Sequence, residues 1–182
     1  AHNLHVNLLS GIVPKRVSKL FPTSELLKDL YFWLTYNDNL GWKHSIAPAK
    51  EKLEKLGKHD VVFFTLTKNP YSWILSLYRR PYHQRGPRKK TFKEFLLNPW
   101  ETIGRDRYKG SFESPIQMWN KKNKSYLVLK DYASCLNITY ENLLDKPEQI
   151  VSDATNSFDF RKKIDTFENL TESYTGISNA NS

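Results

Sequence analysis

The fold is decided by the stretch Val61-Val62-Phe63-Phe64-Thr65-Leu66 and by the Asn69-Pro70 pair that follows it. The first stretch is a continuous β-prone apolar run, which is typical of a strand buried on both faces of a parallel sheet. Asn69 has the side chain of a helix N-cap and Pro70 suits the first helical position, so a helix is predicted directly after the strand. The apolar face of this helix would consist of Trp73, Ile74, Leu77 and Tyr78.

The segments on either side continue the alternation of strands and helices. Further strands are predicted at residues 4–9 and 136–140, and further helices at 24–34, 48–56 and 147–158. Thr91-Phe92-Lys93-Glu94 has the pattern of a capping box and predicts a short helix through Leu97. We therefore expect the α/β class, as a three-layer α/β/α domain with a central parallel sheet that binds ligands beyond the carboxyl ends of its strands.

Size, charge and cysteine content limit the possible functions. A chain of 182 residues suits a single domain, here 1–182 with a polar tail from about residue 169. The net charge of +9 predicts an anionic partner, which could be a phosphorylated nucleotide, an acidic substrate or nucleic acid. Cys135 is the only cysteine, which excludes an intramolecular disulfide and fits a cytoplasmic location. No apolar run approaches the roughly 18 residues of a membrane span, so no such span is expected.

A lysine lies just after the predicted strand at residues 61–66, and a serine lies further along on the predicted helix. Ser76 comes eight residues after Lys68, about two helical turns along. The segment from Thr67 to Tyr82 closely resembles the 3′-phosphate-binding segment of sulfotransferases that use 3′-phosphoadenosine 5′-phosphosulfate (PAPS). The resemblance implies that Lys68 and Ser76 bind the 3′-phosphate, with Lys68 in place of the family's usual arginine. The alternative interpretation is a helix cap followed by an ordinary serine.

Two further segments are similar to the same family. Tyr140-Glu141-Asn142-Leu143-Leu144-Asp145-Lys146-Pro147-Glu148 resembles a stretch late in many sulfotransferases, which implies that Tyr140 contacts the adenine; structurally it also suits a corner between strand and helix. Gly41-Trp42-Lys43-His44-Ser45 is similar to a segment of short microbial sulfotransferases. The resemblance implies that His44 is the general base and that Lys43 stabilises developing negative charge.

The loop after the first predicted strand matches the family less well. In the family it reads roughly Pro-Lys/Arg-Ser-Gly-Thr-Thr and wraps the 5′-phosphosulfate with backbone amides. Val17 stands at the glycine position, and a β-branched residue resists the positive φ that glycine adopts. A basic surface turn is the alternative interpretation. The residues expected to bind the phosphosulfate are Pro14, Lys15, Arg16, Val17, Ser18 and Lys19.

Together, the resemblances imply the P-loop NTPase-like sulfotransferase fold and an enzyme that moves the sulfuryl group of PAPS to a hydroxyl or amine. The product would be 3′-phosphoadenosine 5′-phosphate, and no metal is expected. The acceptor would be a small molecule or a glycan, and the basic run 79–93 suits an anionic one. Two alternatives remain: a protein of this fold that binds nucleotide or polyanion without catalysis, and a basic nucleic-acid-binding module.

Overall fold

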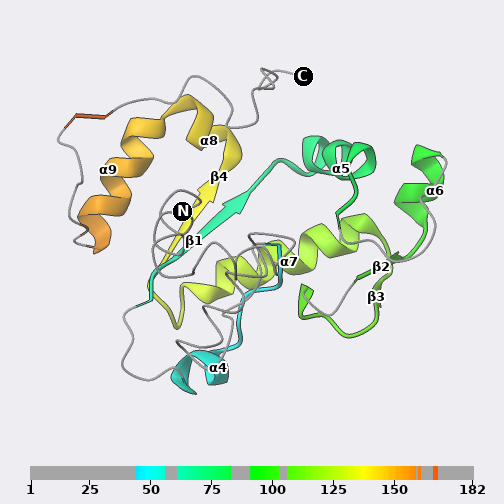
Figure 1. The fold of residues 1–182 in the computed structure, drawn as a ribbon, viewed down its shortest axis with the longest axis horizontal. Coiled ribbons are helices and arrows are strands. Elements are labelled where there is room, and N and C mark those ends of the chain that lie inside the picture. The colour runs from blue at the N-terminus through cyan, green and yellow to red at the C-terminus, as the bar shows by residue number, and fades with distance from the viewer. Residues whose placement is uncertain are drawn as a thin grey trace, which may run out of the picture. The chain divides into compact units, whose positions relative to one another are not determined.

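The computed structural model describes residues 44–55, 61–82, 91–102, 106–158, 160 and 166–167. The helices there are α4 (Lys50–Lys55), α5 (Pro70–Arg79), α6 (Phe92–Leu97), α7 (Pro115–Leu129), α8 (Tyr140–Asp145) and α9 (Pro147–Phe158) (Figure 1). The strands are β1 (Phe63–Thr67), β2 (Trp100–Glu101), β3 (Ser111–Phe112) and β4 (Cys135–Thr139). The predicted strand 4–9 and helix 24–34 lie outside the described residues. No helix in the described ranges is long and apolar enough to cross a membrane.

The chain divides into two compact units, and each is built from separate stretches of sequence. The first unit comprises Ala1–His59 and His83–Ser125, and the second comprises Asp60–Tyr82 and Tyr126–Ser182. Helix α7 belongs to the first unit up to Ser125 and to the second beyond it.

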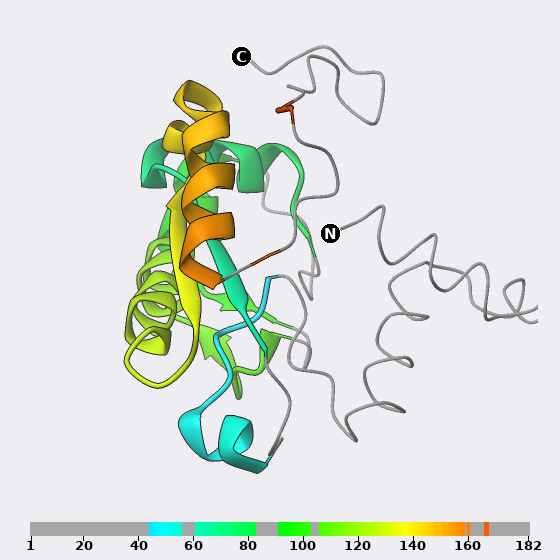
Figure 2. The ribbon, with the colours of Figure 1, turned by 90° about the vertical axis from the view of Figure 1, so that its left-hand side faces the viewer.

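A small parallel sheet forms the centre of the second unit. Strands β1 and β4 pair in parallel, from Phe63 opposite Cys135 to Thr67 opposite Thr139. Midway along the pair, the Thr65 hydroxyl donates a hydrogen bond of 2.7 Å to Asn137 Oδ1. Figure 2 shows the two strands side by side with α9 running along them. The α/β class is therefore confirmed, with mixed helices and strands and a parallel pair.

Helix α5 begins as its sequence predicts. Asn69 Oδ1 accepts a hydrogen bond of 3.0 Å from the Tyr71 amide, and Pro70 occupies the first helical position. Ile74 and Leu77 are buried, which confirms the centre of the predicted apolar face. The cap and the buried face together fix where this helix starts and which side of it points inward.

The burial of β1 differs from the expectation of a strand covered on both faces. Thr65 is buried, whereas Phe64 is 49% and Leu66 51% exposed. The Phe64 ring still contacts Phe158 at the end of α9, with the ring centroids 6.0 Å apart and nearly perpendicular. A continuous apolar run reflects β propensity, but it does not specify how much of each face neighbouring segments cover.

The first unit has its own core of aromatic side chains around β2 and β3. These strands are antiparallel, with Trp100 opposite Phe112, and both residues are buried. Phe95 on α6 packs edge-on against Trp100 at 6.0 Å. The predicted capping box of α6 is confirmed, because Thr91 Oγ1 accepts from the Glu94 amide and Glu94 Oε2 accepts from the Thr91 amide.

Candidate functional site

Three residues that the sequence singles out come together in the second unit. Lys68 Nζ donates a hydrogen bond of 3.3 Å to Ser76 Oγ. The same ammonium group lies 5.0 Å from the centroid of the Tyr140 ring. A cation, a hydroxyl and an aromatic ring therefore share one small region.

The pairing of the parallel strands explains why Lys68 and Tyr140 meet. Thr67 and Thr139 are the last residues of their strands and are partners in the register. Lys68 and Tyr140 are the next residues along each strand, so both emerge at the same carboxyl edge of the sheet. One residue further along, the Asn69 amide donates a hydrogen bond of 2.9 Å to Glu141 Oε1 and ties the two strand ends together.

Helix α5 supplies the hydroxyl. The Ser76 hydroxyl donates its proton to the Ser72 carbonyl oxygen at 2.8 Å, so its oxygen can accept from Lys68. The first turn of α5 contains no acidic residue, but the Glu141 carboxylate accepts from the amide of its N-cap, Asn69, and places a negative charge at this end of the helix. Ser76 and Asn69 are exposed and Lys68 is half-buried, so a ligand in solvent can reach the group.

These features suit a phosphorylated ligand with an aromatic part. An ammonium group and a hydroxyl are the usual donors to phosphate oxygens. A tyrosine ring beside them offers a surface for a base. The arrangement holds no nucleophile aimed at a partner base, so on its own it indicates binding more than chemistry.

The other predicted site residues belong to the first unit, and of them the structure describes His44 alone. His44 is half-buried and belongs to the first unit, directly before the buried Ser45. Lys43 lies outside the described residues, as do Pro14, Lys15, Arg16, Val17, Ser18 and Lys19 of the predicted phosphosulfate loop. The roles assigned to these seven residues stay predictions.

The thiol of Cys135 lies at the far end of β4 from Tyr140. It donates a hydrogen bond of 3.3 Å to Asn137 Oδ1. Burial raises the pKa of Cys135, and the nearby charge of Lys130 opposes this shift. The thiol is therefore protonated near neutral pH and is a poor nucleophile or metal ligand. Within the described ranges, no three His, Cys, Asp or Glu side chains gather as a metal site would require.

A cavity in the first unit was not predicted from the sequence. It has a volume of about 750 Å³ and lies beside β2 and β3. Arg107 in its wall has a left-handed backbone with φ of 57°, and Gly110 has φ of 88°. The lining residues are Glu101, Thr102, Arg107, Tyr108, Lys109, Gly110 and Ser111. The glycine was the one local signal, since it indicates a turn here.

A buried ion pair in the first unit was also not predicted. Lys122 Nζ on α7 lies 2.6 Å from Asp106 Oδ1, and the two side chains are 5% and 1% exposed. Burial lowers the pKa of Lys122, while the hydrogen bond and charge of Asp106 oppose the shift. Asp106 and Lys122 are 16 residues apart, and no local sequence pattern indicates that two residues at this separation pair.

Comparison of the chain with sequence profiles of protein families, with characterised proteins and with solved structures gives no significant match. The function must therefore be argued from the residues and their geometry.

Proposed function

We propose that the chain binds a 3′-phosphorylated adenosine nucleotide at the carboxyl ends of β1 and β4 and acts as a PAPS-dependent sulfotransferase. The observation that carries the proposal is the convergence of Lys68, Ser76 and Tyr140. Two separate segments of sequence suggested these residues for neighbouring parts of one ligand. A three-layer sheet of the P-loop-like sulfotransferase type is part of the same proposal.

The 3′-phosphate would sit between Lys68 and Ser76. Their side chains are already within hydrogen-bond distance of each other at 3.3 Å. One phosphate oxygen could accept from both once the Ser76 hydroxyl turns its proton from the Ser72 carbonyl oxygen to the phosphate. Tyr140, at 5.0 Å from the Lys68 ammonium, would then lie beside the adenosine part of the nucleotide.

The transfer step would use residues from the first unit. The acceptor oxygen or nitrogen attacks the sulfur atom, the bond between sulfur and the bridging phosphate oxygen breaks, and 3′-phosphoadenosine 5′-phosphate leaves with that bond's electron pair. His44 takes the proton of the acceptor, and Lys43 together with the loop 14–19 offsets the negative charge. The wall of the cavity beside β2 and β3 carries cations, hydroxyl groups and the Glu101 carboxylate, which suits a polar acceptor.

Calorimetric titration with 3′-phosphoadenosine 5′-phosphate and with AMP tests the nucleotide site. Lys68→Ala should weaken the first ligand by about 10-fold to 100-fold, the value of a charge-assisted hydrogen bond, and change AMP by less than about twofold. Lys68→Arg should keep the affinity, since a guanidinium also donates to phosphate. Lys146→Ala is the matched control, because it removes the same charge from an exposed residue at the other end of α8.

Equal weak binding of both ligands by the unaltered chain would reject the proposal. If Lys68→Ala lowered the affinity for both ligands equally, Lys68 would not be the residue that binds the 3′-phosphate. Tight, selective binding without any transfer of sulfate would instead support the alternative of a protein of this fold that lacks catalysis.

A further inference from the structure

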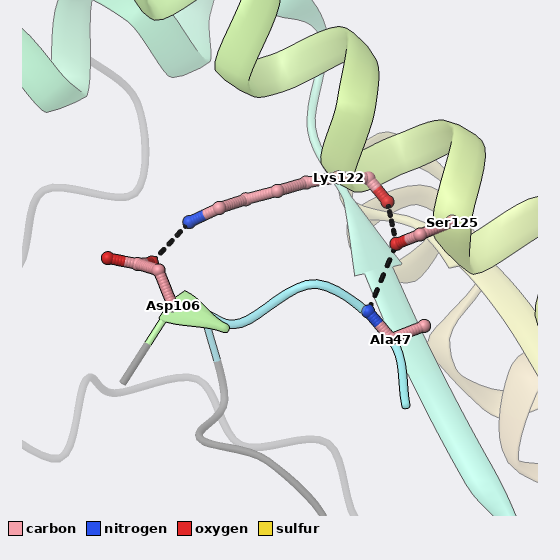
Figure 3. A network of polar contacts seen from close by, with 4 residues as sticks. All are labelled: Ala47, Asp106, Lys122 and Ser125. Carbon is pink, nitrogen blue, oxygen red and sulfur yellow. Dashed lines mark hydrogen bonds and ion pairs between the residues drawn. The ribbon is translucent and has the colours of Figure 1, made fainter. Parts of the chain in front are cut away.

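The backbone directly after His44 is held from two other segments of the first unit. The Ile46 amide donates a hydrogen bond of 3.1 Å to the Asp106 carbonyl oxygen. The Ala47 amide donates one of 3.0 Å to Ser125 Oγ, across a separation of 78 residues (Figure 3). Two consecutive amides are thus fixed to partners that lie far away in the sequence.

The two holding residues are themselves connected. The Ser125 hydroxyl donates a hydrogen bond of 2.6 Å to the Lys122 carbonyl oxygen. This bond orients the hydroxyl oxygen to accept from the Ala47 amide. Lys122 in turn forms the buried ion pair with Asp106 at 2.6 Å. Figure 3 shows the chain of contacts from Asp106 through Lys122 and Ser125 to Ala47. We call these four residues the backbone clamp.

A fully buried ion pair contributes little net free energy to folding. Both charges are removed from water, and Asp106 Oδ2 is buried without a hydrogen-bond partner. Replacing a buried ion pair with apolar residues is often neutral or even stabilising, so such pairs are weak evidence for a stabilising role. A role in holding neighbouring groups at fixed positions accounts for the pair better, since it joins the two segments that grip residues 46 and 47.

We propose that Ser125, Asp106 and Lys122 are positioning residues for His44. They fix the backbone two and three residues after the imidazole, between the buried side chains of Ser45 and Pro48. This inference rests on the proposed function, in which His44 is the general base. Placement matters for that role, because a base displaced by about 1 Å can lose roughly 100-fold in rate.

The test compares Ser125→Ala, which leaves the Ala47 amide without its acceptor, with Ser125→Thr, which keeps a hydroxyl. Ser125→Ala should lower kcat by about 10-fold or more with the KM for PAPS unchanged, and Ser125→Thr should restore most of the activity. Thr91→Ala is the control for simple destabilisation, since it removes the cap of α6 in the same unit without touching the clamp. It should leave kcat near that of the unaltered chain.

A second readout does not depend on activity. The imidazole signal of His44 in a proton NMR spectrum, assigned by its loss in His44→Ala, should shift or broaden in Ser125→Ala and return in Ser125→Thr. An unchanged signal in Ser125→Ala would overturn the clamp, whatever the enzyme assays show. A fully active His44→Ala variant would instead reject His44 as the base, and with it the positioning role, while the nucleotide site at Lys68 could still stand.

Discussion

Lys122 and Asp106 place opposite charges where water has little access. Each side chain is at least nine-tenths buried, and the Lys122 ammonium also lies 5.9 Å from the Phe112 ring. Desolvation opposes both charges, and the contact between them offsets that penalty only while both are present. The two charges therefore depend on each other. When either is removed, the desolvation penalty of the remaining buried charge is no longer offset.

A double-mutant cycle measures this dependence. Lys122→Met and Asp106→Leu should each reduce the free energy of unfolding by about 3–5 kcal/mol, because each leaves an uncompensated buried charge. The double variant should be far more stable than the sum of the single losses implies, within about 2 kcal/mol of the unaltered chain. Urea unfolding gives the three values. Strictly additive losses would mean that the two charges do not depend on each other.

At the scale of elements, the turn between β1 and α5 positions the candidate nucleotide site. Asn69 occupies its centre: its side chain caps the Tyr71 amide, and its own amide donates to Glu141 on α8. Lys68 precedes this residue and Ser76 follows it on α5. The cap therefore sets the distance between the cation and the hydroxyl as well as the start of the helix.

Two cap deletions separate these two roles of Asn69. Asn69→Ala and Thr91→Ala should each lower stability by about 1 kcal/mol, since each removes one capping side chain. Only Asn69→Ala should also weaken 3′-phosphoadenosine 5′-phosphate, because only that cap adjoins Lys68 and Ser76. Thermal unfolding and calorimetric titration of both variants provide the comparison. If both variants bound 3′-phosphoadenosine 5′-phosphate with equal affinity, the Asn69 cap would have no role in positioning the site.

The elements with strong local signals were the ones predicted from sequence. The Asn-Pro start of α5, the capping box of α6 and the proline at the start of α9 are chemical markers that act within a few residues. Helix α7 was not predicted although it begins with a similar marker, since Pro115 is its first residue and the Ser114 hydroxyl accepts from the Gln117 amide. Its apolar residues are interrupted by the polar run 120–124, which hides the helical period. Strands β2 and β3 have two residues each, too few to display a period.

The candidate site was predictable in composition but not in arrangement. Resemblance to known segments suggested Lys68, Ser76 and Tyr140, yet their proximity depends on β1 and β4 being parallel neighbours in a particular register. Register is set by pairing between segments about 70 residues apart, which local sequence does not encode. The same reason explains why the clamp on residues 46 and 47 was not foreseen.

At the scale of the whole molecule, the net charge of +9 is the property most open to a second explanation. Such a charge attracts any polyanion, including nucleic acid, without requiring a specific site. The exposed cations of the described ranges include Arg79, Arg80 and Lys93, which lie close in sequence to the end of α5 and the start of α6. Affinity for an anion at low salt therefore does not by itself support the nucleotide site.

Salt dependence separates general attraction from a built site. Binding to a polyanion releases condensed counterions, so affinity for single-stranded DNA should fall steeply, by about 300-fold or more between 50 and 200 mM salt if roughly six phosphates or more are contacted. A mononucleotide carries no such ion atmosphere, and its 3′-phosphate would meet one cation, Lys68, beside a hydroxyl. Its affinity should therefore fall by less than about 10-fold over the same range. Fluorescence titrations of both ligands at the two salt concentrations give the slopes. Parallel steep slopes would favour the basic nucleic-acid-binding alternative, because a mononucleotide with two phosphate groups has no polymer ion atmosphere to release.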